Sequence, residues 1–303
     1  MIKREYHEGR IAIVSHDAGG AEILASYIKQ QSLVCTYILE GPAVKVFERH
    51  FGSLQTVSLE EGVDFCESVI CGTSGQSDLE WRAIVRSREK GKFVVSLLDH
   101  WINYPERFVR NGIKNLPDEI WVCDIDAETI ATAEFPCTPI KLIDNPYFID
   151  LELELKTLRN QKFFVENDTC IALFVAENIT DYSVIKEGGV HSWGYTEFDA
   201  IEFFLRNIAF LKENYRTVVI RPHPSDSEGK YDCFLGRYPN LVKISNNSSL
   251  LEDIVVSNLV VGCQSMAMVV GLIANKKVMS AIPPGGRICN LPQRDILMLR
   301  DII

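Results

Sequence analysis

Short apolar runs alternate with longer amphipathic segments over most of this 303-residue chain, and this alternation limits the fold more than any other feature. The runs are rich in β-branched residues, which is typical of strands buried on both faces. Each run is followed by a turn and then by apolar residues at helical spacing. Parallel strands need a crossover helix between them, so the alternation predicts an α/β protein with doubly wound parallel sheets.

The predicted strands form two groups, separated by a break at 144–147 and an acidic, helix-compatible stretch at 149–160. A chain of this length fits two domains of about 150 residues. We therefore predict two Rossmann-like domains, residues 1–150 and residues 151–303. The predicted strands are 10–15, 33–39, 68–71, 92–98, 119–123 and 140–143, then 170–175, 217–221, 241–245, 259–262 and 277–282. The predicted helices are 21–30, 43–51, 78–90, 126–134, 197–212, a short one after 246–249, and 265–274, while 179–196 is expected to be a long functional loop.

Composition excludes some classes of function. A net charge of −10, from 31 basic and 41 acidic residues, argues against nucleic acid as a partner, because phosphate backbones require a broad positive surface. The nine cysteines form no CxxC pair and indicate free thiols in a reducing compartment. The first residues lack the apolar core of a signal peptide, and no run of about 18 apolar residues follows. We expect a cytoplasmic protein, and we leave open attachment to the inner face of the membrane.

The strongest local motif is Arg221-Pro222-His223-Pro224, which directly follows the strand at 217–221. Two prolines fix φ on either side of the histidine, so its ring is held at the carboxyl edge of a parallel sheet, where such sheets bind ligands. An imidazole in that place can bind phosphate, transfer a proton or ligate a metal. No second His or Cys lies at ligand spacing from His223, so we expect no metal site.

Other loops of the second half end at the same edge of the predicted sheet. Glu177 follows the first of these strands, a turn at 246–249 is rich in capping residues, and Ser265 precedes an apolar helix. A serine at a helix start offers a hydroxyl and unpaired N–H groups to a phosphate, although a plain helix cap has the same pattern. The residues that we predict to bind a phosphate-containing donor are Glu177, Arg221, His223, Pro224, Ser248, Ser249, Gln264, Ser265 and Met266.

Two loops of the first half also meet at one edge, namely 16–20 and 99–104. Asp17 and Asp99 are each acceptable general bases, and each is equally suited to cap a helix or brace a loop. The residues that we predict to bind an acceptor are His16, Gly19, Gly20, His100 and Trp101. Paired glycines allow close approach of a ligand, and Trp101 either stacks on a sugar or covers the domain edge. Asp124 and Asp126 have the spacing of a metal-binding pair, but they follow a strand and fit a helix cap as well.

The Arg-Pro-His-Pro motif, followed by a serine at the head of a later helix, resembles the His-Pro and serine motifs of GT-B bacterial sialyltransferases, polysialyltransferases and capsule-type transferases. The resemblance implies two Rossmann-like domains facing each other across a cleft, with the acceptor side in the first and the nucleotide donor in the second. It also implies that His223 and Ser265 bind the phosphate of a CMP- or CDP-linked donor while a carboxylate deprotonates the acceptor. The chain departs from the family in having a single serine and no acidic triplet, the nearest being His16-Asp17-Ala18-Gly19.

These observations predict an inverting, metal-independent glycosyltransferase that moves a sugar, such as a sialic-acid-like nonulosonate, to a glycan or another hydroxyl acceptor. Apart from the nucleotide-sugar co-substrate we expect no cofactor. A non-hydrolysing sugar-nucleotide epimerase and a CDP-glycerol-type phosphotransferase remain as alternatives on the same fold. A two-domain binding protein without catalysis is a further alternative. A dinucleotide oxidoreductase is disfavoured because GxGxxG is missing. The oligomeric state is left open.

Overall fold

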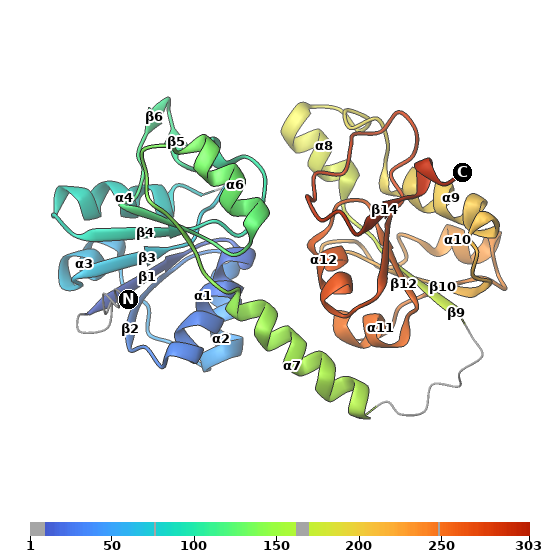
Figure 1. Cartoon of the computed structure of the whole chain (residues 1–303), viewed down its shortest axis with the longest axis horizontal. Helices are drawn as coiled ribbons and strands as arrows, with labels where there is room; N and C mark the ends of the chain where they lie inside the picture. Colours follow the sequence, from blue (N-terminus) through green and yellow to red (C-terminus); the bar gives the residue numbers. More distant parts are fainter. Residues whose placement is uncertain (1–9, 76, 162–169, 248) are drawn as a thin grey trace. The chain divides into compact units, whose positions relative to one another are not determined.

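The computed structural model describes residues 10–75, 77–161, 170–247 and 249–303 (Figure 1). The chain divides into two compact units, Met1–Asp150 and Leu151–Ile303. Helix α7 (Pro146–Gln161) begins in the first unit and ends in the second. Each unit is built on its own six-stranded sheet with only parallel pairings, so the predicted α/β class with two doubly wound sheets is confirmed.

The sheet of the first unit has the order β2-β1-β3-β4-β7-β8. Its strands are β1 (Ile11–Ser15), β2 (Cys35–Leu39), β3 (Ser68–Cys71), β4 (Phe93–Leu97), β7 (Glu119–Val122) and β8 (Ile140–Leu142). The helices are α1 (Ala18–Gln31), α2 (Pro42–Phe51), α3 (Leu59–Phe65), α4 (Leu79–Glu89), α5 (Tyr104–Arg107) and α6 (Ile125–Glu134), with a small hairpin of β5 (Val109–Arg110) and β6 (Ile113–Lys114). The order reverses between β1 and β3, and such a switch point is where open α/β sheets bind ligands.

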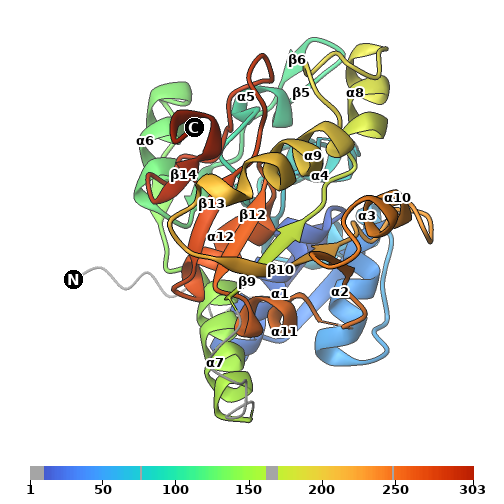
Figure 2. The ribbon, with the colours of Figure 1, turned by 90° about the vertical axis from the view of Figure 1, so that its right-hand side faces the viewer.

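The sheet of the second unit has the order β11-β10-β9-β12-β13-β14. Figure 2 shows β10, β9, β12, β13 and β14 of this sheet. Its strands are β9 (Cys170–Val175), β10 (Tyr215–Arg221), β11 (Val242–Ile244), β12 (Leu259–Gly262), β13 (Lys277–Ser280) and β14 (Ile296–Met298). The helical segments are α8 (Ile179–Glu187), α9 (Glu197–Asn207), η1 (Ile208–Phe210), α10 (Asp232–Arg237), α11 (Leu250–Val256), α12 (Met266–Ile273) and η2 (Leu299–Asp301). Counted within the unit, this is the order 3-2-1-4-5-6 of dinucleotide-binding Rossmann sheets, with the switch point between β9 and β12.

The central strands are buried on both faces because helices cover both sides of each sheet. All five residues of β1 are buried, and so are all four residues of β12. In the first unit the core includes Trp121, which packs edge to face on Tyr27 with ring centroids 5.1 Å apart. This packing fixes the strands and therefore the positions of the loops at their carboxyl ends.

Part of the secondary structure differs from the sequence prediction. The expected loop at 179–196 begins with helix α8, whose Tyr182, Val184 and Ile185 are exposed. A helix that exposes apolar residues lacks the one-sided stripe by which a helix is predicted. The predicted helix 197–212 ends earlier, at Asn207, and continues as η1. Elements of two to seven residues were missed, namely α3, α5, α10, β14, η2 and the β5–β6 hairpin.

One buried carboxylate fixes the turn between β11 and α11. Asp253 Oδ2 accepts from Arg221 Nη1 at 2.7 Å and from Ser245 Oγ at 2.6 Å, while Oδ1 accepts from Asn247 Nδ2 at 2.6 Å. The Asp253 side chain is only 3% exposed, so these hydrogen bonds must offset the cost of removing the carboxylate from water. Arg221 also donates to the Asn247 carbonyl oxygen at 3.2 Å, and the turn is thereby tied to the end of β10.

We predict that Asp253→Ala lowers the free energy of unfolding by about 2–4 kcal/mol, because it leaves Arg221 and two polar groups without their shared acceptor. Denaturant unfolding measures the loss. Glu213→Ala is the matched control, since it removes a carboxylate from the exposed pair with Lys277 and should cost less than about 1 kcal/mol. An equal loss of unfolding free energy in the two variants would contradict the structural role of Asp253.

Candidate functional site

Two consecutive residues after β9 connect the loops on either side of this strand. Glu177 Oε1 accepts three backbone hydrogen bonds, from Cys263 N at 2.8 Å, Gln264 N at 2.8 Å and Ser265 N at 3.0 Å. Asn178 Nδ2 donates to Ser225 Oγ at 3.2 Å on the other side. The loops after β10 and β12 are therefore both tied to the switch point of this sheet.

The hydrogen bonds of His223 define its tautomer. Ser225 N lies 3.2 Å from His223 Nδ1, and a backbone N–H can only donate, so Nδ1 is the acceptor. Ser225 Oγ lies 2.7 Å from the same nitrogen. Burial lowers the pKa of His223, Asp226 opposes this change and Lys230 adds to it, so the ring is neutral near pH 7. A neutral ring that accepts at Nδ1 carries its proton on Nε2 and presents a hydrogen-bond donor there.

A buried carboxylate holds the His223 loop in place. Asp226 Oδ2 accepts from His223 N at 2.7 Å and from the Tyr231 hydroxyl at 2.9 Å. Lys230 Nζ lies 2.6 Å from Asp226 Oδ1 and 2.6 Å from Glu197 Oε1. The Asp226 and Glu197 side chains are at most 1% exposed, so this buried network holds the backbone of His223 in place.

The serine turn differs from the sequence prediction in one respect. Ser265 caps α12 by accepting from Ala267 N at 3.1 Å, and the hydrogen bonds of the described residues leave its hydroxyl proton available to a ligand. The N–H groups of Gln264 and Ser265 were expected to be unpaired, and this was wrong, because both donate to Glu177. Burial raises the pKa of Glu177 to about 6 even though the three N–H groups act in the opposite direction.

The other residues predicted to bind the donor have mixed surroundings. Arg221 pairs with Asp253, as described above. Ser249 caps α11 by accepting from Leu251 N at 3.2 Å, and Ser248 lies outside the described residues. Pro224 is exposed and Met266, the first residue of α12, is partly exposed. Their contact with a donor remains a prediction.

In the first unit, Asp17 is the centre of a polar cluster at the switch point between β1 and β3. Asp17 Oδ1 lies 2.7 Å from His16 Nδ1 and accepts from Ser74 Oγ at 2.8 Å. Its side chain is 32% exposed and makes no cap hydrogen bond to α1. Behind it, Glu80 Oε1 accepts from His16 N at 2.8 Å. Both described hydrogen bonds end on Oδ1, which leaves Oδ2 to accept from a ligand.

Asp99 has a different environment from Asp17. Asp99 Oδ1 forms an ion pair with Arg107 Nη1 at 2.6 Å, and the two side chains are 12% and 13% exposed. The same Arg107 nitrogen donates to Thr73 Oγ1 at 2.7 Å. A methyl group at Gly19 would lie 2.3 Å from Asp99 Oδ2, so the carboxylate packs on the start of α1. The Asp99–Arg107 pair therefore connects the loops after β3 and β4 with the start of α1.

Glycines allow the loops of this edge to approach closely. A Cβ atom at Gly41 would lie 2.5 Å from His16 Nε2, and the φ of Gly41 is +54°, which also favours glycine. A Cβ atom at Gly20 would lie 3.4 Å from Gly72 Cα, an ordinary contact. The His16 ring is therefore enclosed by the loop after β2.

Trp101 is 7% exposed and donates from Nε1 to Asp124 Oδ2 at 2.8 Å. This contact favours the covering role over stacking on a sugar. His100 lies beside it, with ring centroids 5.3 Å apart. Asp124 also caps α6 by accepting from Ala127 N at 2.7 Å. This contact favours the helix cap over the metal-binding pair that the spacing of Asp124 and Asp126 also allowed. Whether His100 and Trp101 contact an acceptor remains a prediction.

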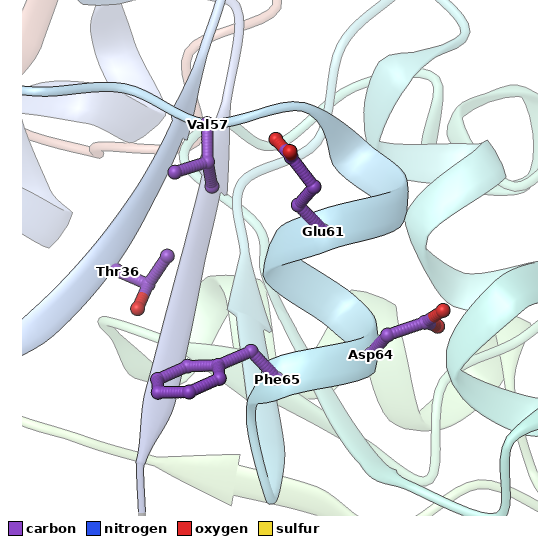
Figure 3. Close-up of a pocket in the computed structure, with 5 residues that line it drawn as sticks. All are labelled: Thr36, Val57, Glu61, Asp64 and Phe65. Carbon is purple, nitrogen blue, oxygen red and sulfur yellow. The ribbon is translucent and has the colours of Figure 1, made fainter.

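A pocket of about 560 Å³ lies elsewhere in the first unit, between β2 and α3 (Figure 3). It is lined by Thr36, Val57, Glu61, Asp64 and Phe65. Thr36 is near the amino end of β2, and the Arg10 guanidinium, which precedes β1, lies 4.1 Å from the Phe65 ring centroid. The pocket is thus toward the amino ends of the strands and does not include the polar clusters at their carboxyl ends.

Neither a cluster of metal ligands nor a membrane-spanning helix is found among residues 10–75, 77–161, 170–247 and 249–303. Within these residues, no group of three or more His, Cys, Asp or Glu side chains is placed to hold a metal ion. None of the helices built from them combines the length and apolar character needed to span a bilayer. Metal independence and membrane attachment remain predictions.

Comparisons with known proteins identify the fold. No protein-family model matches the chain, and no curated protein gives a significant match. Among solved structures, UDP-GlcNAc 2-epimerase from Methanocaldococcus jannaschii is similar with a TM-score of 0.55 and 10% identity, over 89% of this chain and 83% of that chain. The glycotransferase of kitacinnamycin is similar with a TM-score of 0.52 and 13% identity, over 90% and 80%. At these identities the likeness shows the fold alone, and the two units have the GT-B type of α/β architecture.

Sequence reasoning missed Ser74, Glu80, Arg107 and Asp226. Ser74 follows the carboxyl end of β3, so the sheet-edge rule that selected Asp17 and Asp99 could have selected it as well. Glu80 and Arg107 lie on helices, and nothing in their spacing distinguishes them from surface charges. Their importance arises from tertiary contacts.

We predict that Glu80→Gln removes a pH dependence of stability. Burial raises the pKa of Glu80 to about 7 from 4.5, with a smaller contribution from Asp17. The folded state then binds more protons than the unfolded state, so wild-type stability should fall as pH rises from about 4.5 to 7, by about 2–3 kcal/mol. The glutamine can still accept from His16 N and does not ionise. Unfolding measured over this pH range should be flatter for the variant, and equal slopes would contradict the prediction.

Proposed function

We propose that this protein is an inverting glycosyltransferase that transfers a sugar from a nucleotide donor to a hydroxyl acceptor. The observation that carries the proposal is His223, a neutral imidazole with its proton on Nε2 at the carboxyl edge of a 3-2-1-4-5-6 sheet. Sheets of this order bind nucleotides at that edge. A preorganised donor there is suited to stabilise the charge that develops on a departing phosphate.

The second unit is assigned to the donor. His223 Nε2–H and the Ser265 hydroxyl supply two hydrogen bonds to phosphate oxygen, and their loops are tied to Asn178 and Glu177 respectively. Because the loops are fixed before the ligand binds, little reorganisation is needed when it does. We extend the proposal to CMP- or CDP-linked donors and to sialic-acid-like sugars on the resemblance of the Arg-Pro-His-Pro motif and Ser265. We propose no metal in the transfer.

The first unit is assigned to the acceptor, with Asp17 as the general base. A base must be reachable by the acceptor hydroxyl, and Asp17 is partly exposed at the switch point. Asp99 is held in a largely buried ion pair with Arg107, which commits this carboxylate to a partner within the fold. His16 and Ser74 both contact Asp17 Oδ1 and so orient the carboxylate. Gly19, Gly20 and the neighbouring His100 and Trp101 remain candidates for acceptor contact.

The alternative reactions on this fold are epimerisation of a sugar nucleotide and transfer of a CDP-glycerol-type phosphoryl unit. Binding of a nucleotide panel separates them, because preference for UDP favours an epimerase. Nucleotide binding without turnover of any nucleotide sugar would instead favour a binding protein.

We predict that His223→Ala lowers the transfer rate by about 10²–10³-fold, the cost of one hydrogen bond to a developing oxyanion. Nucleotide release from CMP-, CDP- and UDP-sugars, with glycan acceptors present, measures the rate. Lys243→Ala, which removes an exposed side chain from β11 of the same unit, should retain wild-type activity. Full activity in the His223 variant would refute the donor role.

We predict that Asp17→Asn lowers turnover by about 10²–10⁴-fold, because the amide retains the hydrogen bond from Ser74 but cannot take a proton. Nucleotide affinity, measured by calorimetry, should stay close to the wild-type value. Asp99→Asn should chiefly lower thermal stability, since it weakens the ion pair with Arg107. If Asp17→Asn remains active and Asp99→Asn loses turnover with donor affinity intact, the base is Asp99.

A further inference from the structure

The N–H groups of Cys263, Gln264 and Ser265, which we call the amide cluster, converge on one oxygen of Glu177. Successive N–H groups of this kind form an anion site, and pyrophosphate is a ligand that such sites bind. Here the anion is a side chain of the protein itself. The cluster lies at the switch point between β9 and β12, where a dinucleotide-binding sheet of this order holds its pyrophosphate.

Three described cations near this edge are also already paired with carboxylates. Arg221 Nη1 lies 2.7 Å from Asp253, and Lys230 Nζ lies 2.6 Å from both Asp226 and Glu197. Arg287, in the loop that follows β13, pairs with Glu187. These three cations of the described edge are therefore balanced within the fold, and none brings an uncompensated positive charge to a ligand.

From this balance we infer that Glu177 is a specificity residue that disfavours a second donor phosphate. This role rests on the proposed function and narrows the donor to a sugar linked to a nucleoside monophosphate. One phosphate can be held by His223 Nε2–H and the Ser265 hydroxyl without using the amide cluster. A second phosphate needs further donors, but the amide cluster is filled and the carboxylate on it repels another anion.

Two variants separate the effect of the Glu177 charge from the effect of a side chain that occupies the amide cluster. Glu177→Gln keeps an oxygen that can accept the three hydrogen bonds but removes the charge. Glu177→Ala removes both and leaves the amide cluster open to a phosphate oxygen. If Glu177 only braced the turn, Glu177→Gln would leave the preference between CMP and CDP unchanged. The two variants therefore distinguish a specificity role from structural support.

The test is calorimetric titration of the full chain with CMP and with CDP, which share base and ribose and differ by one phosphate. The wild type should bind CMP more tightly. The preference for CMP over CDP should fall by about tenfold in Glu177→Ala and by a smaller factor in Glu177→Gln, as expected when a like charge next to a phosphate is removed. Glu213→Gln, which removes a charge next to the amino end of β10, on the opposite edge of the sheet from the amide cluster, should keep the wild-type ratio.

The outcomes distinguish the two proposals. Binding of CMP and CDP with a ratio that neither Glu177 variant changes overturns the specificity role and leaves the proposed function standing. An equal loss of affinity for CMP and CDP in the Glu177 variants also overturns the specificity role, and it assigns Glu177 to support of the turn. A wild type that binds none of CMP, CDP or UDP overturns the proposed function and the inference together.

Discussion

Three hydrogen bonds to one carboxylate oxygen of Glu177 organise the candidate site of the second unit. Burial penalises the charge of Glu177 and raises its pKa, whereas the backbone N–H groups of the Cys263–Ser265 turn favour the ionised form. The neighbouring Asn178 makes a corresponding contact to Ser225 on the opposite side of β9. The position of His223 relative to Ser265 therefore depends on two adjacent side chains and the strand that carries them.

The first unit uses the same physical device at its own switch point. Asp17 bridges the loops after β1 and β3 through Ser74, and Glu80 binds the backbone of His16 from behind. In each unit a carboxylate joins loops that flank the switch point, where parallel strands leave room for a ligand. The carboxylates differ in their partners, since Asp17 Oδ1 contacts two side chains whereas Glu177 Oε1 accepts from three backbone N–H groups.

The architecture was predictable because buried parallel strands have a strong local pattern. The sequence indicated both sheets and the loops that contain His223, Ser265, Asp17 and Asp99, since each of these directly follows an apolar run. It did not indicate which aspartate is paired, because the partner Arg107 contacts Asp99 only in the folded structure. The pairing of Glu177 with three N–H groups was equally hidden, since backbone donors leave no trace in a sequence. Helix α8 was missed because its apolar residues Tyr182, Val184 and Ile185 are exposed and form no buried stripe.

The contacts that assemble the second site join residues far apart in the chain. Asn178 and Ser225 are separated by 47 positions, and Glu177 reaches donors 86 to 88 positions away. Closing such loops costs chain entropy before the hydrogen bonds can form, so these contacts belong to the slower, non-local part of folding. The amide cluster and the His223 loop should therefore acquire their geometry only once β9, β10 and β12 are paired, and a chain that ends before β12 cannot assemble this site.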